Sequence, residues 1–341
     1  MKTPSRPLVI APAAALLLFV VACVLPPALG WIGGSFPGFL VLENRVVASV
    51  GLERWPATQG GEIFQHEIVA IDGAAVASAD ALLGAIRELP PGTPVHYTLR
   101  RGDRELERTL PTRRFGVADF ALLFGLYLVN GLAMGATALY LLTRRSAAAR
   151  AAAPLLFVGA LWGLTAIDLY GPYRLFRLHA LCEVLLFPAA LHMALAFPAP
   201  FALARERGWL TAAPYAFAAG LALAYQVGLQ SPASYVSAHL LATNLLGVAL
   251  LVLLASQLLR CAWPPSPQAR RQLAVLAGGA LVAIVLPACL TAAELHTGGR
   301  MPQNAVAFTA FLLPLSVGWA ASRDELARGA VRREDPGGGG G

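Results

Sequence analysis

The chain has 341 residues, of which 57% are hydrophobic and only 13% are charged, and its formal net charge is +7. Residues 31–115 contain nine Arg against ten Asp and Glu, so the basic excess belongs entirely to the apolar remainder of the chain. The long apolar segments exclude most soluble enzymes. The excess positive charge flanks these segments, which removes the main support for nucleic-acid binding. We therefore expect the lipid bilayer, and no nucleic acid, as a partner.

Eight long apolar segments divide the sequence, and a water-soluble block separates the first from the second. The segments cover residues 8–29, 118–142, 152–171, 178–198, 209–229, 235–259, 272–293 and 303–321. Each has the ~20 residues that a helix needs to cross ~30 Å of hydrocarbon. The pattern predicts an α-helical integral membrane protein with eight transmembrane helices and an inserted α+β domain. The expected domains are an N-terminal transmembrane anchor (1–30), the inserted domain (31–115), a seven-helix bundle (116–322) and a disordered cytoplasmic tail (323–341).

The basic residues outside the inserted domain fall mainly on one side of the predicted membrane. With the N-terminus inside, fourteen of them face the cytoplasm: Lys2, Arg6, Arg144, Arg145, Arg150, Arg205, Arg207, Arg260, Arg270, Arg271, Arg323, Arg328, Arg332 and Arg333. Only Arg174, Arg177 and Arg300 fall on the other side. The positive-inside rule therefore predicts cytoplasmic termini. The expected location is a bacterial inner membrane, with residues 31–115 in the periplasm. The first segment predicts an uncleaved anchor, and a cleaved signal peptide is the alternative.

The inserted domain combines strand patterns with one helix. Strands are predicted at residues 45–50, 67–71, 95–99 and 105–110. Asp72-Gly73 is a turn signal after the second strand. Ser78 is the predicted N-cap of a helix that runs to about Leu89, where Pro90-Pro91-Gly92 ends it. These elements predict a small α+β domain.

The order of these elements resembles a PDZ domain of the bacterial type. The matching run is Glu67–Val76 with its Asp72-Gly73 turn, then a helix, Pro91-Gly92 and the Leu99–Gly102 hairpin. PDZ domains add a peptide or a protein C-terminus as a strand, beside a loop whose N–H groups hold the terminal carboxylate. The resemblance implies a peptide-binding loop formed by Gly38, Phe39, Leu40 and Val41, although the second glycine usual in this loop is missing. The alternative is that the apolar residues of this loop pack the domain against the membrane.

Three stretches in or just before the last seven apolar segments carry a second resemblance: Leu191–Pro198, Ser266–Gln272 and Leu313–Ser316. Together with the PDZ-like block, they resemble the sensor region of bacterial multi-pass membrane histidine kinases of the quorum-sensing type. In such proteins the last helix leads into a cytoplasmic output domain. No cytoplasmic His and no Gly-rich nucleotide-binding region follow the last segment here. The resemblance therefore implies either a separate cytoplasmic kinase or other output protein, or a truncated gene product.

Ionisable residues recur near the outer ends of the predicted helices, where burial in a membrane is costly unless they have a partner or a function. They are Asp168, His179, Glu183, His239, Glu294 and His296. Their shared depth predicts an outward-facing polar pocket for a ligand. The alternative is that each group lies separately in the lipid headgroup layer. His192, at the inner end of its segment, predicts a structural or signal-coupling role.

Motifs for enzymatic chemistry are missing at the required spacing, so we predict no catalytic residues, no metal site and no cofactor. His66-Glu67 lacks the second His that a HExxH zinc site needs, because Ala70 stands in its place. The four cysteines lie in or beside apolar segments and predict no disulfide framework. Gly131 and Gly135 have the spacing of closely packed membrane helices, which favours tight packing within the bundle or a homodimer.

These observations favour a bacterial inner-membrane sensor. Its ligand would be a periplasmic peptide or a small amphipathic molecule, and a separate cytoplasmic protein would supply the output. The alternative is a PDZ-type membrane scaffold that binds the C-terminus of a periplasmic protein without signalling.

Overall fold

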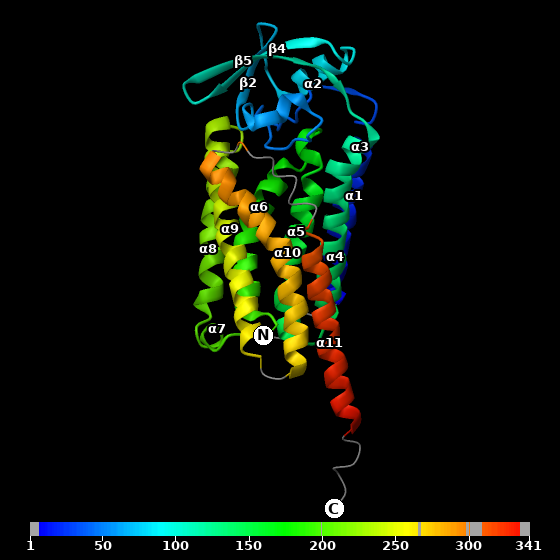
Figure 1. Ribbon diagram of the computed structural model, residues 1–341, viewed down its shortest axis with the longest axis vertical. Coiled ribbons are helices and arrows are strands. Elements are labelled where there is room, and N and C mark those ends of the chain that lie inside the picture. Colours follow the sequence, from blue (N-terminus) through cyan, green and yellow to red (C-terminus); the bar gives the residue numbers. More distant parts are fainter. Residues whose placement is uncertain (1–6, 199, 265–266, 298–299, 301–308, 335–341) are drawn as a thin grey trace, which may run out of the picture.

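The computed structural model describes residues 7–198, 200–264, 267–297, 300 and 309–334, and it is mostly helical (Figure 1). The long helices are α1 (Pro7–Leu29), α4 (Leu126–Thr143), α5 (Ala147–Thr165), α6 (Phe176–Ala196), α8 (Trp209–Gly228), α9 (Pro232–Ala262), α10 (Pro267–Thr297) and α11 (Leu312–Glu334). The short ones are α2 (Ala79–Arg87), α3 (Val117–Phe120), α7 (Ala202–Glu206), the 3₁₀ helices η1 (Pro56–Gly61) and η3 (Asp168–Tyr170), and the π-turn η2 (Ala121–Gly125). Residues 31–115 form a layer over one end of the bundle, which we call the cap (Figure 1). The ends of the bundle are the cap end and the far end.

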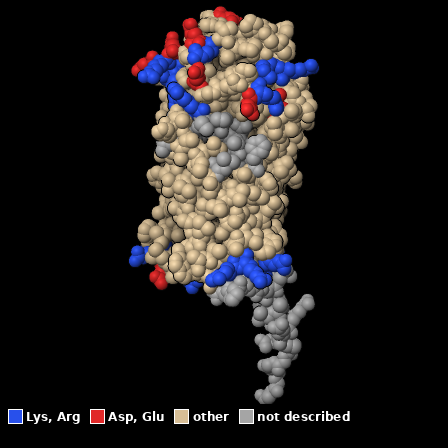
Figure 2. Space-filling model, viewed as in Figure 1, with Lys and Arg blue, Asp and Glu red and all other residues tan. Residues whose placement is uncertain are grey.

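Seven helical stretches of the described residues are long and apolar enough to cross a membrane. They are Leu8–Leu29, Val117–Thr143, Ala147–Tyr170, Phe176–Ala196, Trp209–Gly228, Pro232–Ala262 and Leu273–Leu290. These stretches overlap the first seven predicted segments and indicate a multi-pass membrane protein. Figure 2 shows charged side chains gathered on the cap and at the far end, with an uncharged belt between them on that face. Such a belt is what a bilayer requires of a lipid-facing surface.

The last predicted segment and the predicted tail differ from the observed helix. Residues 301–308, at the start of the segment 303–321, lie outside the described residues, and α11 begins at Leu312. The helix continues through Glu334, so residues 323–334 of the expected disordered tail are helical. The trace of α11 extends beyond the far end of the other helices (Figure 1).

Two glycines let α4 approach its neighbours closely. A Cβ atom at Gly131 would lie 2.6 Å from Leu164 Cγ and 3.2 Å from the Ala160 carbonyl oxygen, both on α5. At Gly135 it would lie 2.9 Å from Leu17 Cδ1 of α1. The glycine spacing noted in the sequence is thus used for packing within the chain, where small residues allow backbones to come together. A homodimer remains a prediction that these contacts do not address.

Replacing Gly131 by alanine should therefore destabilise the bundle. The added methyl group would overlap Leu164, and overpacking of this kind costs about 1–3 kcal/mol. We expect a clear fall in the thermal midpoint of the full-length protein in detergent, followed by tryptophan fluorescence. Gly220→Ala in α8 is the matched control, because no atom lies within 4 Å of the position of its Cβ. Equal midpoints for the two variants would contradict the packing of α4 on α5.

The cap contains two small antiparallel sheets. β1 (Ser35–Phe36) pairs with β6 (Arg113–Arg114), so the chain enters and leaves the cap at neighbouring points. The second sheet has the order β3-β2-β4-β5. Its strands are β2 (Glu67–Ile71), β3 (Ala74–Ala75), β4 (Pro94–Arg101) and β5 (Arg104–Pro111). Three of the four predicted strands are thus present as β2, β4 and β5.

The predicted helix and its N-cap residue, Ser78, are both confirmed. Helix α2 begins after Ser78, whose hydroxyl oxygen accepts a hydrogen bond from the Ala81 N–H at 3.1 Å.

The predicted strand at residues 45–50 is wrong, because only isolated bridges form at Val46 and Val47. Arg45 interrupts the extended chain there with a φ of 66°, in the left-handed region. Its guanidinium pairs with Glu67 Oε1 at 2.5 Å, so this residue binds β2 through its side chain.

The cap is joined to the bundle on the side of α1 and α4 by buried aromatic rings. Phe115 and Trp31 of the cap lie 5.5 Å and 6.1 Å from Phe124 of η2, measured between ring centroids. Asp119 of α3 adds polar contacts, since its carboxylate accepts hydrogen bonds from Trp55 Nε1 at 2.9 Å and from Arg54 Nε at 2.8 Å. The hydrophobic core therefore continues from the cap into the bundle.

A second group of hydrogen bonds joins the cap to the loops on the side of α6 and α8. Asn44 Nδ2 donates to the Leu229 carbonyl oxygen at 2.9 Å, and the Tyr173 hydroxyl donates to the Val41 carbonyl oxygen at 3.2 Å. Burial raises the pKa of Tyr173 well above its usual value, so its hydroxyl stays protonated and able to donate. The cap is thus attached on two opposite sides of the bundle.

Helices α6 and α9 are tied together at the far end. Arg260 of α9 donates from Nη2 to the Ala194 carbonyl oxygen of α6 at 2.9 Å, and its guanidinium lies 4.0 Å from the Phe201 ring centroid. Gln257 Nε2 also donates to the Phe197 carbonyl oxygen, at 3.2 Å. These bonds satisfy carbonyl groups that the end of α6 leaves without helical partners.

Candidate ligand cavity beneath the cap

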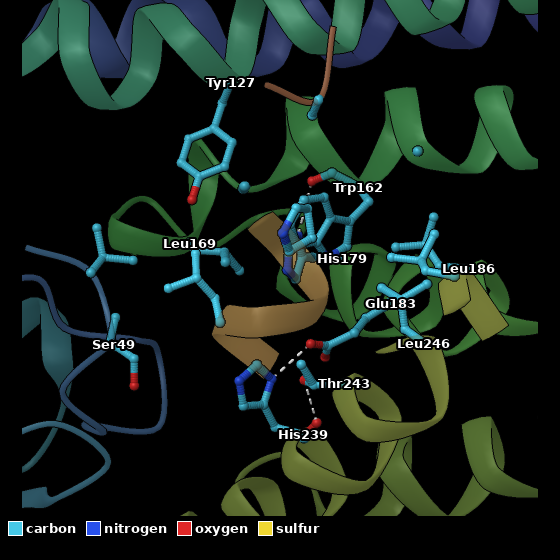
Figure 3. A pocket seen from close by; sticks show the side chains of 18 of the residues that line it. Ser49, Tyr127, Trp162, Leu169, His179, Glu183, Leu186, His239, Thr243 and Leu246 are labelled. Carbon is cyan, nitrogen blue, oxygen red and sulfur yellow. Dashed lines mark hydrogen bonds and ion pairs between the residues drawn. The ribbon is translucent and has the colours of Figure 1, made fainter. Parts of the chain in front are cut away.

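A cavity of about 180 Å³ lies between the cap and the bundle. Ser49 and Gln65 of the cap contribute to its lining, and the remaining lining residues come mainly from α4, α5, α6, α9, α10 and α11. Figure 3 shows Tyr127, His179, Glu183 and His239 around this space, with Ser49 on a cap loop at its edge. The cavity is therefore shared by the two layers of the molecule.

A buried carboxylate–imidazole contact, which is an ion pair when His239 is protonated, joins two helices at the cavity wall. Glu183 of α6 lies with Oε1 2.7 Å from His239 Nδ1 of α9 (Figure 3). Its second oxygen, Oε2, accepts a hydrogen bond from the Tyr225 hydroxyl of α8 at 2.8 Å. Glu183 is only 4% exposed and His239 is 9% exposed. Both carboxylate oxygens thus have partners, as a buried carboxylate requires.

The helical repeat explains how these side chains reach the cavity. His179 and Glu183 are four residues apart and share one face of α6. Tyr235 and His239 have the same spacing on α9, and their rings stack with centroids 5.6 Å apart. Tyr225 reaches Glu183 because it lies in the last turn of α8, at the cap end.

His179 has a defined hydrogen-bonding role in the same wall. Its Nδ1 atom lies 3.2 Å from the Trp162 carbonyl oxygen and 3.1 Å from Thr165 Oγ1. A carbonyl oxygen can only accept, so Nδ1 carries the proton and donates. In the neutral ring the other nitrogen, Nε2, is then an acceptor. Thr165 Oγ1 donates in turn to the Leu161 carbonyl oxygen at 2.7 Å, which leaves its lone pairs for His179.

Two polar atoms of lining residues are buried without a hydrogen-bond partner among the described residues. They are Gln65 Oε1 in the cap and Trp162 Nε1 on α5. The amide nitrogen of Gln65 is satisfied, since it donates to Ser49 Oγ at 2.7 Å. Buried polar groups in proteins are almost always hydrogen-bonded, so such atoms at a cavity indicate a place for a ligand or for water.

The rest of the wall is apolar. Lining residues further toward the far end include Met134, Leu156, Leu186, Leu246 and Leu250. From His239 to Leu250, α9 advances by about 16 Å at 1.5 Å per residue. The cavity is therefore lined by polar groups near the cap and by hydrocarbon deeper in the bundle.

The structure brings together three of the six residues predicted from the sequence to form a pocket, namely His179, Glu183 and His239. Asp168 is buried but is not a lining residue, and its Oδ2 atom accepts a hydrogen bond from the Leu175 N–H at 2.6 Å. It thereby organises the turn between α5 and α6. His296 is exposed, and the side chain of Glu294 is outside what the structure describes. His192 lies away from the cavity, 3.3 Å from the Tyr215 hydroxyl.

The predicted peptide-binding loop is packed into the cap. Gly38, Phe39, Leu40 and Val41 are all buried, and Phe39 contacts the Tyr97 ring with centroids 5.2 Å apart. The Leu40 carbonyl oxygen accepts a hydrogen bond from the Ala48 N–H at 2.9 Å. A peptide could reach the N–H groups of this loop only if these side chains moved, so the role of the loop in binding stays a prediction.

Several residues of the cavity and of its supporting contacts carry no signal in the sequence that would have selected them. Tyr235, which lines the cavity, and Tyr225, which supports Glu183, resemble ordinary interfacial tyrosines of membrane helices. Gln65 lies in the cap, and only the folded chain places it over the bundle. Thr165 is one exception, because its hydroxyl near a helix end, three residues after Trp162, could have suggested a polar face.

No group of three or more His, Cys, Asp and Glu side chains suited to a metal ion occurs among the residues that the structure describes. Comparison of the chain with protein-family models, with curated proteins and with solved structures returned no match.

Proposed function

We propose that this chain is a bacterial inner-membrane receptor that binds a small amphipathic molecule or a peptide and relays its presence to a separate cytoplasmic output protein. The observation that most supports this function is the shared cavity, which Gln65 of the cap and Glu183 and His239 of the bundle all line. A ligand there would contact both layers, and differential contacts of this kind allow a ligand to shift a conformational equilibrium.

In this proposal the cap is a periplasmic PDZ-like domain and both termini are cytoplasmic. The chain would correspond to the input half of the quorum-sensing kinases that its sequence resembles. The far-end contacts of Arg260 with α6 would lie on the side of the output protein. The distribution of basic residues supports this orientation, because fourteen of those outside the cap are then cytoplasmic.

A PDZ-type scaffold is the second candidate function. It is favoured by the order of β2, α2 and the β4–β5 hairpin in the cap, which is the order expected from the sequence. A scaffold would bind the C-terminus of a periplasmic protein through the cap and would need no cavity in the bundle. The two functions therefore differ in whether filling the cavity matters.

Filling the cavity without altering the cap tests the receptor function. Leu246→Trp would place a large side chain in the cavity, whereas Leu251→Trp is a matched control because Leu251 is 52% exposed on the outer face of α9. Each variant replaces the wild-type protein in the native host at equal expression, and the transcriptome is compared with that of a deletion strain. A receptor predicts that Leu246→Trp resembles the deletion or is permanently active, and that Leu251→Trp resembles the wild type. Wild-type behaviour of both variants would reject the receptor and favour the scaffold.

The orientation gives a separate prediction. Ala75 is exposed in β3 of the cap, and Ala147 is exposed at the far end, where α5 begins. In a background without the four native cysteines, Ala75→Cys should react with a membrane-impermeant maleimide in intact spheroplasts, and Ala147→Cys should react only after lysis. The reverse pattern would place the cap in the cytoplasm, against the positive-inside rule.

A further inference from the structure

We propose that the cavity takes an uncharged amphiphile with a hydroxyl or amide N–H donor at its cap end and a short hydrocarbon chain directed toward the far end. This assignment rests on the receptor function proposed above and narrows its ligand to one chemical class. The charges, the hydrogen-bonding groups and the apolar wall of the cavity each contribute to it.

The charges of the described lining residues disfavour a ligand with a net charge. Glu183 is its one carboxylate among the described lining residues, and His239 and Tyr225 already occupy both oxygens of that group. No Arg or Lys occurs among these lining residues, so an anionic ligand would find no cation except the paired His239. A buried charge without a partner is strongly unfavourable. A neutral ligand leaves the ion pair intact.

The polar groups at the cap end favour a ligand that carries a hydrogen-bond donor. His179 Nε2 is an acceptor because Nδ1 donates to the Trp162 carbonyl oxygen. Gln65 Oε1 is a second acceptor, buried and without a partner among the described residues. A hydroxyl or amide N–H can donate to such atoms, and a hydroxyl can also accept from Trp162 Nε1. A hydroxyl carries one proton and can donate to one of these two acceptors, whereas an ether or a hydrocarbon of the same size can donate to neither.

The shape of the space favours a chain for the apolar part. The lining of α9 extends over about 16 Å from His239 to Leu250, and its apolar part lies toward the far end. The volume of about 180 Å³ is small for that length. It is close to the roughly 150 Å³ of an engineered apolar cavity that binds benzene. A space of this size suits a short alkyl chain better than a folded peptide.

Photolabelling of the full-length protein in lipid nanodiscs tests this ligand class. The probe is octan-1-ol carrying a diazirine, and labelled residues are mapped by mass spectrometry. Competitors are 1-octanol, heptyl methyl ether, octanoate and octylammonium. We expect label on cavity residues such as Leu246 and Leu250, displaced by 1-octanol at a concentration at least tenfold lower than that of the ether, because an unmet buried acceptor costs about this factor. The two ions should compete no better than the ether.

Two variants locate the selectivity in the predicted acceptor. His179→Phe keeps a ring but removes the nitrogen, so the ratio between the alcohol and the ether should fall well below that of the wild type while cavity labelling persists. His192→Phe is the matched control, because this histidine lies outside the cavity near Tyr215, and its ratio should equal that of the wild type. Loss of the ratio in both variants would remove His179 as the specific acceptor and would overturn the assignment.

Other outcomes are equally decisive. Strongest competition by octanoate or octylammonium, equal competition by the alcohol and the ether, or no label in the cavity would each overturn the ligand class. The receptor function is judged separately by Leu246→Trp in cells. Alcohol selectivity together with a wild-type cellular response of that variant would keep the ligand class and reject the receptor.

Discussion

Replacing Glu183 by leucine is expected to lower the free energy of unfolding of the full-length protein by about 3–5 kcal/mol, because one partner of a buried ion pair is removed. His239 Nδ1 and the Tyr225 hydroxyl would both lose the acceptor that now lies 2.7 and 2.8 Å away. Both groups are buried, so the cost of burying each donor would be only partly compensated.

The measurement is unfolding of the purified protein by sodium dodecyl sulfate in mixed micelles, followed by tryptophan fluorescence. Glu183→Gln keeps one side-chain oxygen of similar position, so its loss should be smaller than that of the leucine variant. Glu62→Leu is the surface control, since Glu62 pairs with Arg108 at 2.7 Å on the exposed side of the cap and should have no measurable effect. A Glu183→Leu protein as stable as the wild type would show that the pair does not stabilise the fold.

Asp119→Ala should loosen the cap from the bundle, at a cost of about 3 kcal/mol for the buried donors left behind. The carboxylate now accepts from Trp55 Nε1 and Arg54 with Oδ1, and from the Gly116 N–H at 2.7 Å with Oδ2. Trp55 is fully buried, so its indole N–H would have no other partner. The loss falls at the junction where the core continues from the cap into α4.

Limited trypsin digestion in detergent detects this loosening at Arg113 and Arg114, where β6 pairs with β1. We expect faster cleavage there in Asp119→Ala and an intermediate rate in Asp119→Asn, which keeps one oxygen. Asp103→Ala, in the exposed turn of the β4–β5 hairpin, is the control and should cleave like the wild type. Unchanged cleavage in the alanine variant would mean that the aromatic rings alone hold the cap in place.

The apolar helices were predictable because about twenty consecutive apolar residues permit few other structures in a membrane. The strand at residues 45–50 was not, since apolar residues there suggest β structure, whereas the positive φ of Arg45 and its bond to Glu67 are tertiary features. Ser78, by contrast, is a local signal, and its role as the N-cap of α2 was predicted correctly.

The cavity residues also include some that the sequence predicts and some that only the folded structure reveals. His179 and Glu183 could be placed on one face from their spacing, and their depth is shared with His239. The sequence does not say which helices are neighbours, so the contact of Glu183 with Tyr225 could not be foreseen. Asp168 shows the opposite error, because a carboxylate at the right depth serves the Leu175 N–H of a turn and takes no part in the cavity. The depth of a residue in the membrane can be predicted from the sequence, but which helices are neighbours is decided by packing in the folded chain.

The hydrogen bonds of Arg260 with α6 restrict how α6 and α9 can move relative to each other. Glu183 and His239 join α6 and α9 near one end, and Arg260 joins the same two helices near the other through the Ala194 carbonyl oxygen at 2.9 Å. Sliding one helix past the other by a single turn, about 5.4 Å, would exceed the length of either link. Helices α6 and α9 can therefore tilt or rotate together as a rigid unit, but one cannot slide along the other without breaking one of these two links. A displacement of these two helices at the cap end would therefore produce a displacement of similar size at the far end.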